Sequence, residues 1–225
     1  MDLENTGSTQ VTMAKSQTTE YEYLQHIGEP VPKSKLFWKR FWDLVFGLIG
    51  FIISIPFIII FGIIIKLTSK GPIFFKQERV GYMGKNFYVV KLRSMRNDAE
   101  AKTGAVWAQK NDPRVTPVGR FMRKTRIDEL PQFWNVLKGD MSLVGPRPER
   151  PELTEKFYKK WPEFPQRLRI IPGITGYAQV NGGYDISPDE KCHLDNYYIE
   201  HYSFTFDMKI AFQTIKTMFT GDGAR

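Results

Sequence analysis

The sequence has very little cysteine and histidine. Its one cysteine, Cys192, excludes a disulfide framework and a CxxC metal site. Its three histidines (His26, His193 and His201) lack the spacing of metal ligands, and we assign them no function. This composition is compatible with a reducing compartment such as the cytoplasm.

Long apolar runs are also scarce, because only residues 44–65 form one. A polytopic transporter or channel is therefore excluded. The run starts too far from Met1, and is too long, to be the apolar part of a signal peptide. As a helix, its roughly 22 residues would extend about 33 Å, which matches the hydrocarbon core of a bilayer.

Pro56 lies near the middle of this run, two residues after Ser54, and predicts a kink there. Basic residues flank the run on both sides: Lys33, Lys35, Lys39 and Arg40 before it, and Lys66, Lys70, Lys76 and Arg79 after it. A re-entrant helix that bends at Pro56 would bring both flanks to the same anionic leaflet. Because membrane helices tolerate proline, a plain spanning helix is an equal alternative at this point.

The rest of the chain is long enough for one compact domain. The whole chain has 225 residues, of which 42% are hydrophobic, and its formal net charge is +8. Such a charge suits nucleic acid, a membrane surface or phosphorylated substrates. A non-catalytic basic module bound to the membrane is therefore one hypothesis, although no nucleic-acid motif is present.

Local patterns divide the chain into three parts: a flexible polar tail at 1–34, the apolar anchor at 35–70 and a domain at 71–225. In the domain, IFFKQERVG and NFYVVKLRSM flank a Gly-rich turn and predict a β-hairpin. Helices are expected at 118–126, 128–138, 187–200 and 205–219, the last of them amphipathic. Residues 103–118 are expected to form a loop.

The densest cluster of charged residues is RFMRKTRIDELP, which contains Asp128 and Glu129. In the simplest interpretation, Asp128 or Thr125 caps the following helix. In a catalytic interpretation, the surrounding Arg and Lys keep Asp128 ionised, so that it can attack phosphorus as a nucleophile. Glu129 beside it could help to hold Mg²⁺.

Two further groups could bind phosphate. Pro146 and Pro148 stiffen the backbone around Arg147, whose guanidinium suits bidentate phosphate binding. Lys91 and Arg93 alternate along a predicted strand and would therefore share one face of it. A rigid turn with an exposed arginine, and a solvated strand face, are the corresponding structural alternatives.

Taken together, these segments resemble the bacterial sugar transferase family, the small monotopic phosphoglycosyl transferases. The matching pieces cover about residues 35–220: GPIFFKQERVG, KLRSM, NDPRVTPVGRFMRKTRIDELPQFWNVLKGDMSLVGPRPE, PGITGYAQVNG and DMKIAFQTIK. The resemblance implies an α+β, mostly helical monotopic membrane protein of the short form. It further implies a broken re-entrant helix, a small β-hairpin and surface amphipathic helices.

The resemblance also implies a reaction in two steps at the cytoplasmic face of the bacterial inner membrane. Asp128 would attack the β-phosphate of a UDP-sugar and release UMP, and undecaprenyl phosphate would then take the sugar phosphate from the enzyme. Glu129 and Asp128 would hold Mg²⁺, and Arg123 and Arg147 would bind substrate phosphates. The expected pathway is exopolysaccharide, capsule or glycan assembly, with no nucleic acid as a partner and room for a homodimer.

Two positions depart from the family pattern. Ile55 separates Ser54 from Pro56, so hydroxyl bonding at the kink is not assured. Ile171 stands before PGITG, where many relatives have a basic residue, and Arg169 or Arg167 could supply that charge instead. Nothing in the sequence distinguishes one UDP-sugar from another.

Overall fold

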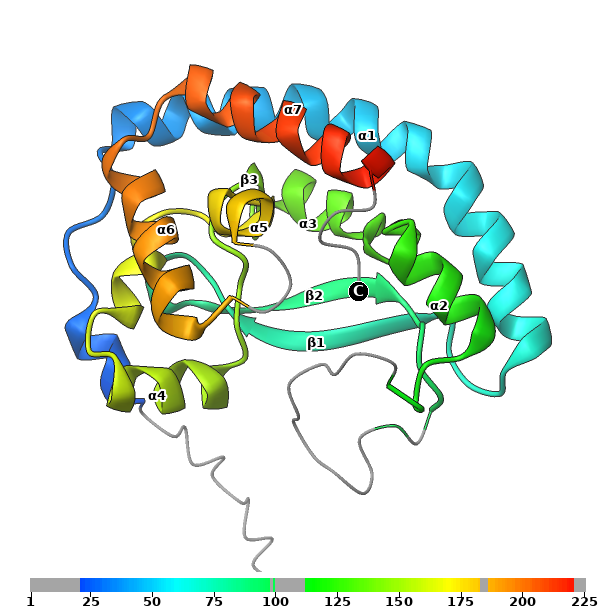
Figure 1. The fold of residues 1–225 in the computed structure, drawn as a ribbon. Helices are drawn as coiled ribbons and strands as arrows, with labels where there is room; N and C mark the ends of the chain where they lie inside the picture. The colour runs from blue at the N-terminus through cyan, green and yellow to red at the C-terminus, as the bar shows by residue number, and fades with distance from the viewer. Residues whose placement is uncertain (1–20, 98, 100–111, 183–185, 221–225) are drawn as a thin grey trace, which may run out of the picture.

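The computed structural model describes residues 21–97, 99, 112–182 and 186–220. Its longest element is α1 (Lys33–Thr68), a helix of 36 residues that contains Pro56. In Figure 1 it arches over the top of the domain and down one side. It is the one helix in the described part of the chain that is long and apolar enough to cross a membrane.

Pro56 lies within a helix that is continuous from Lys33 to Thr68, and Figure 1 shows that this helix bends along its length without being interrupted. Proline removes one backbone donor, but the adjoining turn is bridged by a side chain, because the Ser54 hydroxyl donates to the carbonyl of Phe51 at 2.7 Å. The Ile55 between Ser54 and Pro56 therefore does not prevent hydroxyl bonding at this point.

The predicted hairpin is confirmed. Strands β1 (Phe74–Val80) and β2 (Asn86–Leu92) pair antiparallel, with Phe75 opposite Lys91. The turn contains the short 3-10 helix η2 (Tyr82–Gly84), in which Met83 and Gly84 have φ of 50° and 79°. Glycine tolerates this left-handed conformation without strain.

Helices account for most of the remaining domain: α2 (Pro117–Lys124), η3 (Ile127–Glu129), α3 (Gln132–Lys138), α4 (Pro151–Lys160), η4 (Phe164–Arg169), α5 (Tyr177–Asn181), α6 (Pro188–Glu200) and α7 (Phe204–Thr220). Gly139 ends α3 with a φ of 93°. A second, parallel sheet joins β3 (Ser142–Val144) to β4 (Gly173–Thr175). The sequence did not predict β3. Residues 103–111 of the predicted loop lie outside the described residues.

The first half of α1 packs closely on α3. A side chain at Gly50 would collide with the ring of Phe133, and one at Gly47 would meet Val136. Arg40 donates to the carbonyls of Val136 and Leu137 near the end of α3, the latter at 2.6 Å. The small residues of α1 thus determine how near the two helices approach.

The beginning of α1 is joined to the domain by buried polar contacts. Lys39 is buried and lies 2.8 Å from the Asp207 carboxylate of α7 and 3.3 Å from the Tyr198 hydroxyl of α6. One turn later, Asp43 accepts a hydrogen bond of 2.8 Å from the Ser142 hydroxyl.

The end of α1 rests on the same domain. Ile65 is buried in a cluster with Leu92 of β2 and Met122 of α2. Arg93 follows β2 and donates to the carbonyls of Ser69 and Lys70 at 2.9 and 2.7 Å, which satisfies carbonyls at the helix end. Both ends of α1 are therefore fixed to one domain.

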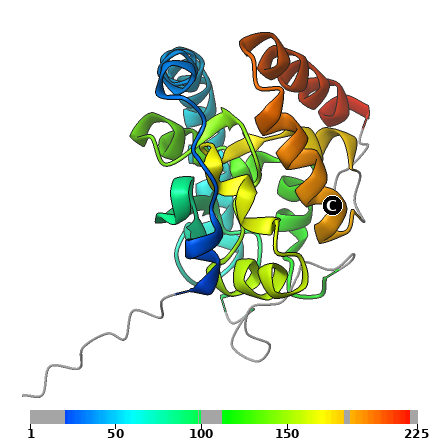
Figure 2. The same ribbon diagram turned by 90° about the vertical axis from the view of Figure 1, so that its left-hand side faces the viewer.

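Residues 21–32 differ from the flexible tail predicted for 1–34. They contain the 3-10 helix η1 (Glu22–His26) and run beside α4 and up to the start of α1 (Figure 2). Tyr23 is buried against Val80, Tyr158 and Leu168. This burial, which depends on surfaces far along the sequence, orders the segment.

The predicted amphipathic helix α7 has one buried face and one exposed face. Ile210 is fully buried in the main core cluster. In contrast, Phe204, Met208, Phe212 and Ile215 are exposed, with Phe212 at 78%. A stripe of this kind suits a helix that packs on the core while its other face meets a membrane surface.

Candidate active site

A cavity of about 300 Å³ lies beside the hairpin and collects most of the predicted site residues. Lys91, Arg93, Arg123, Asp128 and Arg147 all line it. Residues that the sequence analysis did not select also line it, namely Gln77, Arg79, Glu149, Arg150 and Lys191. The cavity is thus rich in basic groups and suited to an anionic ligand.

The acidic pair is placed by a break between α2 and α3. Arg126 has a left-handed backbone with a φ of 56°, and the single turn of η3 follows it. Asp128 and Glu129 lie on that turn and both are buried. Neither caps α3, because its N-cap residue is Pro131, without a side-chain cap. The capping interpretation is therefore wrong.

Glu129 is enclosed by basic side chains. Lys91 lies 2.7 Å from its Oε1 oxygen, Arg147 donates to the same oxygen, and Arg126 lies 3.6 Å from Oε2. Burial alone would raise the pKa of Glu129, but the charges of Arg147 and Lys91 outweigh it and hold this pKa well below its usual range. Glu129 is therefore the firmly ionised member of the pair.

Asp128 differs from its neighbour. Its residue is 6% exposed, and it makes no hydrogen bond or ion pair with the described part of the chain. Burial, and next the negative charge of Glu129, raise the pKa of Asp128 despite Lys91, Arg123 and Arg147 nearby. Lys91 and Arg147 thus form their ion pairs with Glu129 and not with Asp128, while their charges and that of Arg123 still favour the ionised form of Asp128. Ionisation of Asp128 stays a prediction.

Arg147 is presented by a rigid loop, as the two prolines predicted. The loop carbonyls are held from behind: Arg79 donates to that of Pro148 at 3.0 Å, and Arg167 donates to that of Arg147 itself at 2.8 Å. Glu129 raises the pKa of Arg147, so this guanidinium stays charged.

Arg123 projects from α2 into the same cavity. Its Nε donates to the Ser94 hydroxyl at 3.0 Å, and its Nη groups make no hydrogen bond to the described residues. They are therefore available to an anion in the cavity.

Lys91 and Arg93 both line this cavity, as their alternation along the strand predicted. Lys91 pairs with Glu129, while the guanidinium of Arg93 is engaged by the carbonyls at the end of α1. Both side chains therefore already have partners within the protein, and phosphate binding by this pair stays a prediction.

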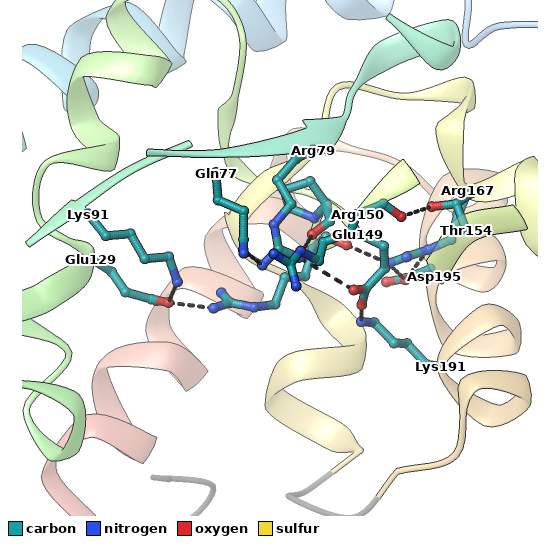
Figure 3. Close-up of polar contacts among 12 residues, drawn as sticks. Gln77, Arg79, Lys91, Glu129, Glu149, Arg150, Thr154, Arg167, Lys191 and Asp195 are labelled. Atoms are coloured by element: carbon teal, nitrogen blue, oxygen red, sulfur yellow. Dashed lines mark hydrogen bonds and ion pairs between the residues drawn. The ribbon is translucent and has the colours of Figure 1, made fainter. Parts of the chain in front are cut away.

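A second charged network, which the sequence analysis missed, contains Arg79, Glu149, Lys191, Arg167 and Asp195 (Figure 3). Lys191 of α6 pairs with Glu149, and Arg79 of β1 lies 3.5 Å from it. Burial would raise the pKa of Glu149, but Lys191, Arg79 and Arg167 lower it to about 2. The position of Glu149, two residues after Arg147, is the only sequence signal that could have indicated it.

Arg167 and Asp195 complete this network. Their side chains are 2% and 1% exposed and form two hydrogen bonds of 3.0 and 2.5 Å. Arg169 instead donates to the Glu29 carbonyl at 2.8 Å, on the segment before α1, and does not line the cavity. Of the two arginines considered as a substitute near Ile171, Arg167 is therefore the one that contacts the site.

Known proteins match the part of the chain that contains this cavity. The profile described as bacterial sugar transferase matches residues 34–221. A putative undecaprenyl-phosphate N-acetylgalactosaminyl 1-phosphate transferase of Bacillus subtilis is 62% identical over 130 residues, which cover 58% of this chain and 72% of the relative.

Two further relatives align over most of the chain. A UDP-N-acetylgalactosamine-undecaprenyl-phosphate N-acetylgalactosaminephosphotransferase of Aeromonas hydrophila is 45% identical over 84% of this chain, but the match spans only 45% of that relative. An uncharacterized sugar transferase, EpsL, of Bacillus subtilis is 39% identical over 82% of this chain and 89% of its own length.

Proposed function

Because this chain belongs to the bacterial sugar transferase family, we propose that it transfers a sugar 1-phosphate from a UDP-sugar to undecaprenyl phosphate. Relatives are named as transferases between these two substrates. The observation that carries the proposal is the difference between the two acids: the carboxylate of Glu129 is neutralised by basic side chains, whereas that of Asp128 is buried and unpartnered.

In the first step, an Asp128 oxygen forms a bond to the β-phosphorus while the bond from that phosphorus to the bridging oxygen breaks, and UMP leaves. In the second step, a phosphate oxygen of the lipid attacks the same phosphorus, and the carboxylate of Asp128 is released. One phosphoanhydride replaces another, so the enzyme needs to supply only positioning and charge stabilisation. The unpartnered state of Asp128 supports its role, because no internal bond must be broken before attack.

The basic residues serve the diphosphate. Arg123 has free Nη groups, and Arg147 is charged and held by its loop, so both can bind phosphate oxygens. Lys91 and Arg147 also hold Glu129, which fixes the position of η3 relative to the hairpin. The cavity thus binds the donor and orients the nucleophile with the same side chains.

Mg²⁺ belongs to this proposal. No group of three or more His, Cys, Asp or Glu side chains within the described ranges is placed to hold a metal ion. The residues fit an ion that takes one or two carboxylates and completes its shell with substrate phosphates, since Asp128 is unpartnered and Glu129 Oε2 has one ion-pair neighbour, Arg126, at 3.6 Å. When bound, it would neutralise charge on the diphosphate.

We also propose that α1 enters and leaves the bilayer on the same side, at the cytoplasmic face of the inner membrane. Lys39 and Asp43 fix its beginning to the domain, while Ile65 and Ser69 fix its end to that domain. A spanning helix would separate these contacts by a bilayer. Labelling of Pro30→Cys and Lys85→Cys in intact cells tests this, because a spanning helix would make one of them reactive from outside.

The decisive experiment for the reaction is Asp128→Asn, with Asp140→Asn as the control on a half-buried acid that does not line the cavity. UMP release and a sugar phosphate adduct, detected by protein mass, should be lost in the first variant and kept in the second. Full activity of Asp128→Asn would refute the mechanism. A panel of UDP-sugars should begin with UDP-N-acetylgalactosamine, because two similar relatives are named for that sugar.

A non-catalytic basic module would behave differently. It would bind anions in a salt-dependent way and turn over no sugar nucleotide. The same UMP assay on the unmodified protein therefore separates the two hypotheses.

A further inference from the structure

A second cavity, of about 530 Å³, lies against the hairpin and α1. Four elements line it. They are α1 with Ile55 and Ile59, β1 with Phe74 and Lys76, β2 with Tyr88 and Val90, and α3 with Trp134. We call it the lateral groove. Most of its lining side chains are apolar, in contrast to the basic catalytic cavity.

The hairpin separates the two cavities. Successive side chains of a strand point to opposite faces, and here Phe75, Gln77 and Arg79 line the catalytic cavity while Lys76 lines the lateral groove. Phe74, at the open end of the hairpin, lines both cavities. The two spaces therefore approach each other at that end.

Asp128, the proposed nucleophile, lies near this open end of the hairpin. Asp128 lines the catalytic cavity together with Phe74. Pro131, three residues after Asp128, lines the lateral groove with Phe74. A ligand that lay in the groove could thus bring its terminal group to Asp128 around the open end of the hairpin.

The chemistry of the walls identifies the kind of ligand. One wall is α1, whose Ile55 and Ile59 are exposed and apolar, so an apolar ligand can enter from the bilayer side. Lys76 and Lys138 line the groove as well, and Lys76 forms no ion pair with the described residues. An apolar body with an anionic end matches both features.

We propose that the lateral groove binds the isoprenyl units next to the phosphate of the polyprenyl phosphate acceptor, with the phosphate at the Phe74 end. This inference rests on the proposed function. The water-soluble donor then occupies one face of the hairpin and the lipid acceptor the other. Neither substrate has to cross the site of the other, and each reaches Asp128 from its own phase.

The experiment compares two substitutions on the same helix in the full chain in lipid nanodiscs. Ile55→Trp fills the groove, whereas Ile53→Trp adds the same bulk at an exposed position outside it. Val90→Phe fills the groove from β2 and serves if Ile55→Trp does not fold. Each variant is assayed for the burst of UMP without acceptor and for transfer to undecaprenyl phosphate.

Filling the groove should raise the KM for undecaprenyl phosphate about tenfold, because part of the apolar contact is lost. The UMP burst should be unchanged, and Ile53→Trp should change neither quantity. Unchanged acceptor KM in both groove variants, with a normal burst, would overturn the groove assignment. Absence of a burst in the unmodified protein would instead refute the proposed function.

Discussion

The buried pair of Arg167 and Asp195 gives the most informative perturbation of this fold. Asp195→Asn keeps the size of the side chain but leaves the Arg167 guanidinium charged in a site where the paired side chains are 2% and 1% exposed. Breaking such a pair on one side costs about 3–5 kcal/mol, because the remaining charge loses its partner. Since asparagine retains one acceptor, we expect about 3 kcal/mol, or roughly 6–12 °C in Tm for a domain of this size.

The control is Asp140→Asn. Asp140 pairs with Lys138 at 2.8 Å, but these side chains are 24% and 51% exposed. An exposed pair of this kind contributes about 0–1 kcal/mol. Thermal unfolding in nanodiscs, followed by tryptophan fluorescence, measures both variants. Equal Tm shifts in the two variants would refute the reasoning.

A double substitution separates stability from activity. Burial raises the pKa of Asp195 more than Arg167 lowers it, so the ionised pair is itself costly to bury. Arg167→Met combined with Asp195→Leu should therefore recover most of the lost stability. Activity should stay low, because the Arg147 carbonyl has lost the donor 2.8 Å away. A hydrogen bond of about 1.5–3 kcal/mol corresponds to a loss of roughly 10–150-fold in UMP release. Full recovery of activity would show that Arg167 does not position Arg147.

Three further outcomes follow from the same contacts. Glu129→Gln removes a charge that raises the pKa of Asp128, so the acidic limb of the pH profile of UMP release should move to lower pH. An acidic limb at the same or a higher pH would contradict this. The pKa of Glu149 is lowered to about 2, so its ionised form stabilises the fold above its ordinary pKa of 4.5, and this stability is lost as the pH falls toward 2. The contribution is roughly 3 kcal/mol. It should be absent in Glu149→Gln when the free energy of unfolding is measured from pH 6 to pH 2. Gly50→Leu should destabilise the packing of α1 on Phe133 by about 1–3 kcal/mol, whereas Ile49→Leu, at an exposed position, should leave Tm unchanged.

Local patterns in the sequence were sufficient for the elements that form by local rules. Strand alternation around a glycine turn predicted β1 and β2, and the glycine stop predicted the end of α3 at Gly139. The apolar run predicted the long helix α1, and the crowding of bases near Asp128 and Glu129 predicted a charged site. Each of these signals is contained within about ten to twenty residues of chain or follows directly from side-chain type.

Tertiary structure alone decided which charges meet. Asp128 and Glu129 are adjacent and look equivalent in sequence, yet Lys91 and Arg147 reach only Glu129, since the hairpin and the Arg147 loop approach from its side. The partners of Lys91 and Arg93, which are Glu129 and the carbonyls of Ser69 and Lys70, likewise come from distant segments. Likewise, the ordering of residues 21–32 and the pairing of β3 with β4 depend on surfaces that distant segments bring together.

The anchor shows the same division. Residues 44–65 determine that α1 is apolar and that Pro56 lies within it, but they leave a span and a re-entrant helix equally open. The contacts of Lys39 with Asp207 at one end, and of Arg93 with Ser69 at the other, depend on a folded domain between them. Composition therefore determines that the helix is long and apolar. The positions of its two ends are decided by long-range packing, because only the folded domain brings these partners within reach.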